Sequence, residues 1–187
     1  PYAISRLVKG LASSNEASRQ GFAVALTELL ARLPTELSTP VLPLIISTST
    51  PTSGADSREE RELLFARLLG LHAVIRSGVL DRPTSTDGET FREVILALLA
   101  LSGRKSWMKE PAYWVIIEGV RTLLELVGEN IPGWKEAELA WCLQRLVNDS
   151  REKSKGFSAE KIALVLVLQA YGIVRRLLSR IMESHDN

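Results

Sequence analysis

The chain has 187 residues, and its 23 Lys and Arg residues nearly balance its 22 Asp and Glu residues, so its formal net charge is +1. Hydrophobic residues make up 45% of the sequence and charged residues 24%, which is the usage of an ordinary globular domain. This composition excludes a disordered charged tail, a collagen-like chain and a disulfide scaffold. The balanced charge removes the simplest argument for nucleic-acid binding, so any such surface has to come from local patches.

The one cysteine, Cys142, cannot form an internal disulfide, and the sequence shows no signal peptide. Both features favour a reducing, intracellular compartment. The sequence begins with Pro1 rather than Met, so we expect a fragment of a longer protein. The longest nearly apolar stretch, residues 162–174, is shorter than the about 20 residues of a membrane-spanning helix, and we interpret it as a buried core helix.

The first two predicted helices form an antiparallel pair. Apolar residues recur every three or four positions over residues 2–11 and again over residues 15–33, which gives each segment one apolar face. Ser14 or Asn15 can cap the start of the second helix, and Pro34 follows its end.

A shorter third helix is expected over residues 39–46, and within it residues 41–46 are the one run that is ambiguous between helix and strand. Residues 47–57 are rich in Ser, Thr, Pro and Gly, which bury little apolar surface, so we predict a flexible surface loop there. Ser57 then begins the strongest helix, because Ser57 and Glu60 have the spacing of a capping box. Gly78 ends this helix. Its predicted buried face consists of Leu64, Leu68, Leu71 and Ile75.

Further helices are predicted in the second half of the chain. They cover residues 87–101, 111–127 and 136–148, and a last helix that follows Ser158 and Lys161 runs to about residue 182. Trp114 and Trp141 are expected in the core, whereas Trp107 and Trp134 occupy corners between helices. Cys142 lies at an apolar helical position, so we expect an inert buried thiol.

About eight helices and no convincing strand predict an all-α fold. One helical hairpin per roughly 45 residues is the period of HEAT and armadillo arrays, in which each hairpin buries its apolar face against its neighbours. We therefore predict an irregular HEAT/armadillo-like α-solenoid, an armadillo-type fold, in which residues 1–187 form a single helical-repeat segment. A compact helical bundle is the alternative.

The sequence offers no convincing catalytic or metal-binding group. His72 lies near the buried side of the strongest helix, and His185 lies in a polar tail. The absence of Cys and His clusters argues against a zinc site, and residues 102–106 lack the spacing of a phosphate loop. Helix capping and turns explain Asp81 and Asp87, so the paired acids that nucleotidyl transfer needs for its metal ions are missing. We predict no catalytic residue, no metal and no cofactor.

Local basic and aromatic groups are the candidate contacts for nucleic acid or for a protein partner. They are Arg104, Lys105, Trp107, Lys109, Trp134, Arg175, Arg176 and Arg180. The first four form an exposed corner that could meet phosphate and a base, and the three last arginines lie on one side of the final helix. Trp107 and Trp134 could anchor a partner, because exposed Trp is a frequent hot-spot residue. The alternative is a solvated face, in which arginine stems cover apolar surface and the tryptophans pack under corners.

Two stretches of the sequence are similar to a known family. The first is RLVKGLASS at residues 6–14, which continues through residues 17–30. The second is EERELLFARLLGL at residues 59–71, which ends with IRSG at residues 75–78. In this order they resemble the N-terminal region of the Myb-binding protein 1A family, also called DNA polymerase phi, or DNA polymerase V in fungi. The loop at residues 48–56 suggests a fungal member.

The resemblance implies a long helical-repeat scaffold of the nucleolus, within the nucleus, with a role in ribosomal RNA transcription and ribosome biogenesis. Its implied partners are ribosome-assembly or rDNA transcription proteins and, in addition, pre-rRNA or rDNA. The family's nucleic-acid-binding tail is expected at the far C-terminus, outside this segment. We expect no membrane and no small-molecule substrate.

The sequence lacks a catalytic motif that would justify the polymerase name. We therefore predict a non-catalytic scaffold segment that acts through protein binding. Two alternatives stay open. The first is a direct nucleic-acid-binding domain that uses the local basic patches, and the second is a nucleotidyltransferase, as the family name suggests.

Overall fold

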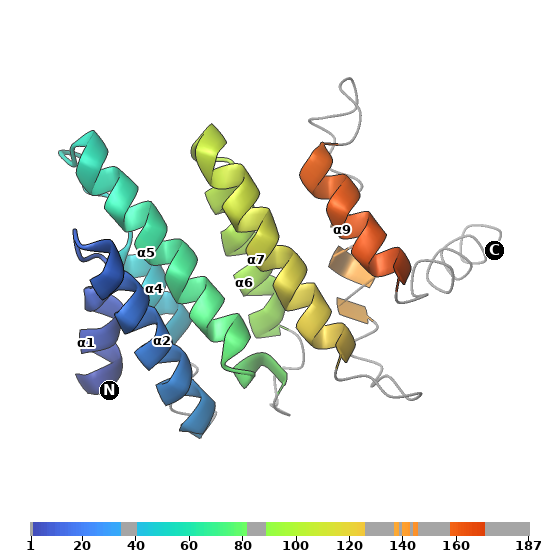
Figure 1. The fold of residues 1–187 in the computed structure, drawn as a ribbon, viewed down its shortest axis with the longest axis horizontal. Helices are drawn as coiled ribbons and strands as arrows, with labels where there is room; N and C mark the ends of the chain where they lie inside the picture. The colour runs from blue at the N-terminus through green and yellow to red at the C-terminus, as the bar shows by residue number, and fades with distance from the viewer. Residues whose placement is uncertain are drawn as a thin grey trace. The chain divides into compact units, whose positions relative to one another are not determined.

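The computed structural model describes residues 2–34, 41–81, 89–125, 137–138, 140–142, 144–145 and 158–170. Every regular element within these ranges is helical, so the predicted all-α fold is confirmed (Figure 1). The elements are α1 (Tyr2–Gly10), α2 (Glu16–Arg32), α4 (Val41–Thr48), α5 (Ser57–Arg76), the 3-10 helix η1 (Val79–Asp81), α6 (Glu89–Ser102), α7 (Ser106–Glu125) and α9 (Ala159–Ala170). The chain divides into two compact units, Pro1–Val115 and Ile116–Asn187.

Helical hairpins that stack on one another build the first unit. Helix α1 packs against α2 in one hairpin and α4 packs against α5 in the next, while α1 also contacts α4 and α2 contacts α5. Figure 1 shows α2 and α5 side by side in this unit. Stacking of like helices is how the hairpins of repeat arrays bury their apolar faces. An irregular α-solenoid and a compact helical bundle are both consistent with the described helices.

Asn15 caps the start of α2. Its side-chain Oδ1 accepts a hydrogen bond from the backbone N–H of Ser18 at 3.0 Å, so Asn15, rather than its neighbour Ser14, fills the capping role. The helix ends at Arg32, two residues before Pro34, as the sequence predicts.

Two glycines lie where a side chain of the neighbouring helix packs against their backbone. A Cβ atom on Gly10 of α1 would lie 2.5 Å from the ring of Phe22 on α2. A Cβ atom on Gly70 of α5 would lie 2.8 Å from the side chain of Ile45 on α4. Because ordinary carbon contacts are about 3.5–4.0 Å, a larger residue at either position would push the paired helices apart.

The segment that the sequence left ambiguous between helix and strand is helical. Helix α4 covers Val41–Thr48, whereas residues 39 and 40 lie outside the described residues. Pro43 is compatible with this helix because it is the third helical residue, where the backbone N–H would have no intrahelical acceptor. The predicted loop at residues 47–57 is shorter than expected: the helices on either side leave residues 49–56 between them.

The start of α5 differs from the sequence prediction. Asp56 is the N-cap, and its Oδ1 accepts hydrogen bonds from the backbone N–H groups of Arg58 at 2.9 Å and Glu59 at 2.7 Å. Ser57 is the first helical residue, so the predicted capping box of Ser57 and Glu60 is wrong. A carboxylate at the N-cap satisfies two orphan donors and also offsets the positive end of the helix dipole, which a neutral hydroxyl does less well.

The rest of α5 agrees with the prediction. The four residues predicted for its core face, Leu64, Leu68, Leu71 and Ile75, are all buried. Gly78 follows the C-cap Ser77 and has a φ of 70°, in the left-handed region that glycine enters without a steric penalty. Helix α5 contacts α2, α4 and α6, and it is therefore the central helix of the first unit.

Helix α7 begins earlier than predicted, and its buried face differs from the predicted one. It starts at Ser106, so Pro111 lies inside the helix rather than at its first position. The prediction that Trp114 lies in the core is wrong, because its side chain is 56% exposed. The buried stripe instead follows Met108, Ala112, Val115, Ile116, Val120 and Leu123. Trp114 makes an edge-to-face contact with the partly buried His72, with ring centroids 5.2 Å apart.

The second unit is described in part. The described residues between 137 and 145 are helical, Cys142 is buried as predicted, and Trp141 is partly buried. Two charged residues, Glu138 and Lys161, are buried in this unit. Asp87, His185 and the part of the last predicted helix after residue 170 lie outside the described residues. Of the helices that the structure describes, none has the length and apolar character needed to cross a membrane.

Arg67 of α5 holds the C-terminal end of α4. Its Nε donates to Ser49 Oγ at 3.0 Å, and its Nη2 lies within hydrogen-bond distance of Ile46 O at 3.1 Å, Ser49 O at 3.2 Å and Thr50 Oγ1 at 2.9 Å. The last carbonyls of a helix have no intrahelical donor, and the Arg67 guanidinium supplies one from the neighbouring helix. Burial and, as a smaller cause, the positive charge of Arg104 lower the pKa of Arg67.

Removal of the Arg67 hydrogen bonds should destabilise the first unit. We expect Arg67→Met to lower the free energy of unfolding by about 2–3 kcal/mol, because partly buried acceptors lose a charged donor. Arg67→Lys should lower the free energy of unfolding by less, because lysine keeps the positive charge although it lacks the planar guanidinium. Urea denaturation followed by circular dichroism measures both. The control Arg32→Met removes an exposed arginine with an i,i+4 ion pair, and it should change stability by under about 0.5 kcal/mol. Equal losses for Arg67→Met and the control would contradict this role.

The capping residue of α5 can be identified by two single substitutions. Asp56→Ala should lower the free energy of unfolding by about 1 kcal/mol, because the N–H groups of Arg58 and Glu59 lose their acceptor. Ser57→Ala, at an exposed first-turn position, should cost under about 0.5 kcal/mol. The same urea titration distinguishes the two variants. A larger loss for Ser57→Ala would support the capping box instead.

Candidate interaction site

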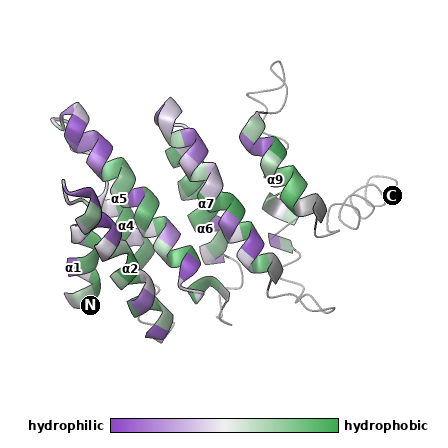
Figure 2. Ribbon diagram, in the orientation of Figure 1, coloured by the Kyte–Doolittle hydropathy of each residue, from purple (hydrophilic) through white to green (hydrophobic). Residues whose placement is uncertain are grey.

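Basic and aromatic side chains from three helices meet on the first unit. We name the group formed by Arg19 of α2, Arg58, Arg61 and Phe65 of α5, and Trp107 of α7 the basic–aromatic cluster. The three α5 residues recur at spacings of three and four, so they share one face of that helix. Figure 2 shows that hydrophilic residues gather at the N-terminal end of α5, where this face begins.

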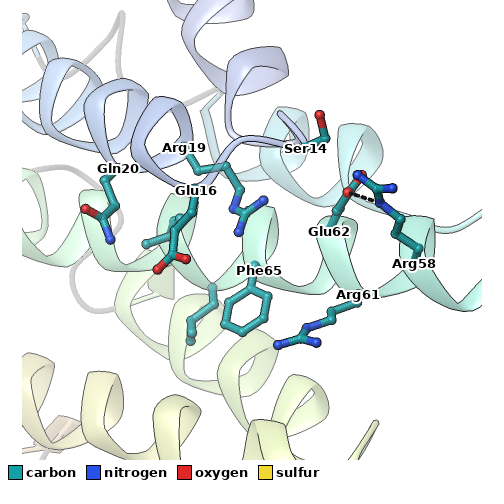
Figure 3. Close-up of a pocket in the computed structure, with 10 residues that line it drawn as sticks. Ser14, Glu16, Arg19, Gln20, Arg58, Arg61, Glu62 and Phe65 are labelled. Atoms are coloured by element: carbon teal, nitrogen blue, oxygen red, sulfur yellow. Dashed lines mark hydrogen bonds and ion pairs between the residues drawn. The ribbon is translucent and has the colours of Figure 1, made fainter.

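Two stacked rings form the centre of the cluster. The ring centroids of Phe65 and Trp107 are 5.5 Å apart, and the ring planes are inclined by 27°. The Arg61 guanidinium lies 5.7 Å from the Trp107 centroid and 5.8 Å from the Phe65 centroid. The Arg19 guanidinium, on α2, lies 5.8 Å from the Phe65 centroid (Figure 3). Each cation lies within the range of a favourable contact with a ring, and Trp107 keeps 42% of its surface exposed.

The arginines of the cluster differ in how far their N–H donors are used. Arg19 Nη1 donates to the backbone oxygen of Ser13 at 2.8 Å, which holds the side chain against the α1–α2 corner. Arg58 Nε pairs with Glu62 Oε1 at 3.2 Å. Arg61 contacts the two rings and, among the described residues, makes neither a hydrogen bond nor an ion pair. Its guanidinium therefore carries the donors that are available to a ligand.

A cavity of about 430 Å³ opens beside the cluster, between the α1–α2 corner and α5 (Figure 3). Its polar lining includes Glu16, Arg19, Gln20, Arg58, Arg61 and Glu62. Its apolar lining consists of Phe65, Leu68 and Leu69. The cavity thus combines arginine donors, two carboxylates and an apolar surface, which suits a ligand with both polar and apolar parts.

The corner predicted from sequence lies beside this cluster, with much of its charge already paired. Lys105 Nζ is 2.7 Å from Glu60 Oε2, and Arg104 Nη2 is 3.7 Å from Glu60 Oε1. Lys109, one turn further along α7, is partly buried and has interactions of its own. Of the four predicted corner residues, Trp107 is the one that the structure places in the aromatic stack.

The other predicted contacts cannot be compared with the structure. Trp134, Arg175, Arg176 and Arg180 lie outside the described residues. Within the described ranges, no three His, Cys, Asp or Glu side chains gather in a way that could hold a metal ion.

Sequence reasoning missed most of the cluster. Arg19, Arg58, Arg61 and Phe65 were not candidates, because the candidates chosen from the sequence lay in the corners between helices and on the last helix. The spacing of Arg58, Arg61 and Phe65 did contain a signal for a shared helix face. No local pattern, however, links residue 19 to residues 61 and 107, since helix packing alone brings them together.

Comparison with known proteins places the chain in a family. The sequence model of the DNA polymerase phi family matches residues 2–185. The chain is 40% identical over 125 residues to the rDNA transcriptional regulator pol5 of Schizosaccharomyces pombe, a match that covers 67% of this chain and 13% of the relative. It is 26% identical to the rDNA transcriptional regulator POL5 of Saccharomyces cerevisiae, a match that covers 69% of this chain and 15% of the relative. No solved structure gives a significant match.

These matches confirm the resemblance seen in the sequence and extend it. The two stretches that carried the resemblance end at residue 78, whereas the family match continues almost to the last residue. The chain spans only a small part of either relative, and both relatives are named as transcriptional regulators rather than polymerases. The chain belongs to the DNA polymerase phi family.

Proposed function

We propose that this chain is a non-catalytic helical-repeat scaffold segment of a nucleolar protein, within the nucleus, that acts in rDNA transcription and ribosome biogenesis. The observation that carries the proposal is the match to two relatives that are named for the regulation of rDNA transcription. Stacked hairpins such as α1–α2 and α4–α5 support it, because such arrays present extended helix faces to partners.

Protein binding is the activity that the first unit's surface supports best. Arginine and aromatic residues are enriched in protein interfaces, whereas lysine is depleted. The basic–aromatic cluster has this composition: three arginines, Phe65 and a Trp107 that is 42% exposed. We infer that its partners are ribosome-assembly or rDNA transcription proteins.

Crosslinking and affinity purification of the tagged chain from fungal nuclei test this function. We expect ribosome-assembly or rDNA transcription proteins to be enriched over the tag alone, and the enrichment to survive treatment with RNase and DNase. Mass spectrometry identifies the proteins. Recovery of no such protein would contradict the proposal, and recovery that nucleases abolish would favour the second function described next.

Direct nucleic-acid binding is the second candidate function. The half-exposed Trp107, close in sequence to Arg104 and Lys105, favours it, because single strands bind to aromatic rings beside positive charge. The ion pairs that Arg104 and Lys105 form with Glu60 argue against nucleic-acid binding, because paired charges attract phosphate groups less strongly. The described residues therefore favour the protein-binding function.

Salt titration of RNA binding separates the two functions. We expect labelled oligouridine to bind weakly, with a slope of log K against log salt shallower than about −2, which corresponds to roughly three phosphate contacts on a single strand. Glu60→Gln should strengthen RNA binding several-fold, because it leaves the positive charges of Arg104 and Lys105 unopposed. Fluorescence anisotropy at two salt concentrations measures both quantities. Tight, steeply salt-dependent binding by the wild-type chain would make nucleic-acid binding the primary function.

A further inference from the structure

We propose that the cavity beside the basic–aromatic cluster binds a peptide segment of a partner protein that carries an Asp or Glu side chain next to an apolar residue. The inference rests on the proposed protein-binding function and adds to it a site and the chemistry of the bound segment. It draws on described residues of the first unit alone.

The arginines of the cavity have unused donor capacity. The Arg61 guanidinium lies over the faces of Phe65 and Trp107, and such contacts leave the N–H groups at its edge free to donate. No described residue accepts a hydrogen bond from Arg61. Arg19 uses one Nη1 bond, to Ser13, and keeps further donors. A planar guanidinium matches a carboxylate with two parallel hydrogen bonds, so a carboxylate is the natural acceptor.

The cavity carries a small net positive charge. Three arginines and two glutamates line it, which leaves a formal charge of +1. One peptide carboxylate neutralises that charge. A nucleic-acid backbone would instead bring a phosphate with every nucleotide close to Glu16 and Glu62, and next to Glu60 on the neighbouring surface. The two glutamates of the cavity therefore favour a peptide with a single acid over a polyanion.

Part of the cavity is apolar. Phe65, Leu68 and Leu69 line it together with the charged groups, and its volume of about 430 Å³ admits an apolar side chain beside the carboxylate. Burial of that side chain supplies affinity, while the arginines orient the segment. Arg61 and the Trp107 ring that it covers are of the residue types enriched in interface hot spots.

A peptide array tests the proposal even while the partner protein is unidentified. The probes are blocked dodecapeptides of Ser, Gly and Ala in which one Asp or Glu is flanked by Leu, Ile or Phe. Each has a twin with Asn or Gln in place of the acid. We expect the chain to bind a subset of the acidic peptides and to bind their neutral twins at least about tenfold more weakly, because the charged hydrogen bonds are lost.

Substitutions at Arg61 connect this binding to the site. For the peptides that bind best, calorimetry of Arg61→Ala should show a loss of affinity of about tenfold or more, as at a hot-spot arginine. Arg61→Lys should retain part of the affinity that Arg61→Ala loses, because lysine keeps the positive charge but lacks the planar guanidinium with its paired donors. The matched control is Arg32→Ala, which removes an exposed arginine near the other end of α2 and should leave binding unchanged. Arg61 is exposed, so circular dichroism should show an intact fold for each variant.

Three results would overturn the proposal: no preference for the acid over its neutral twin, equal binding by Arg61→Ala, or full competition by oligouridine at equal concentration. Failure of this site is distinct from failure of the proposed function. If the array shows no preference while wild-type and Arg61→Ala chains recover the same nuclear proteins, the scaffold function stands and its partner binds elsewhere. If purification recovers no such protein, the proposed function itself fails.

Discussion

The burial of α5 between α2, α4 and α6 is the constraint on which the first unit depends. Leu64 and Leu71 of this helix are fully buried, and Gly70 permits the close approach of Ile45 from α4. With three sides occupied, α5 has one remaining face. That face carries Arg61 and Phe65, so the candidate site is a consequence of the packing that stabilises the unit.

Arginine has two different roles on this one helix, and its surroundings decide between them. Arg67 lies against the end of α4, where orphan carbonyls accept its N–H groups, and it therefore joins two helices. Arg61 lies six residues earlier, over two aromatic rings that accept no conventional hydrogen bond, and its donors stay available. Glu60, beside Arg61 in sequence, points its carboxylate instead at Lys105 and Arg104. Arg104 and Lys105, whose charges are paired with Glu60, thus lie near Arg61, whose donors are available.

The helices and their core faces were largely predictable because periodicity is a local property of the chain. The buried face of α5 and the cap at Asn15 follow from residues close together in sequence. The errors arose where two local signals competed. Ser57 and Asp56 are both residue types that cap helices well. Asp56 is the cap of α5 because its carboxylate accepts two backbone hydrogen bonds. Trp114 was expected in the core from the apolar spacing of its helix, but the buried stripe of α7 runs through Met108, Ala112 and Val115 and leaves Trp114 exposed.

The sequence by itself determined an all-α chain, the positions of most helices and membership of the DNA polymerase phi family. These properties depend on local spacing and on matched residues, and neither requires contacts between distant parts of the chain. Only the tertiary structure decided which charges are paired and which aromatic rings meet. Arg19, Arg61 and Trp107 lie far apart in sequence, and the stacking of α2 on α5 with the start of α7 beside them brings them together. The candidate site is therefore a property of helix packing, because side chains on separate helices become neighbours only when the apolar faces behind them are buried.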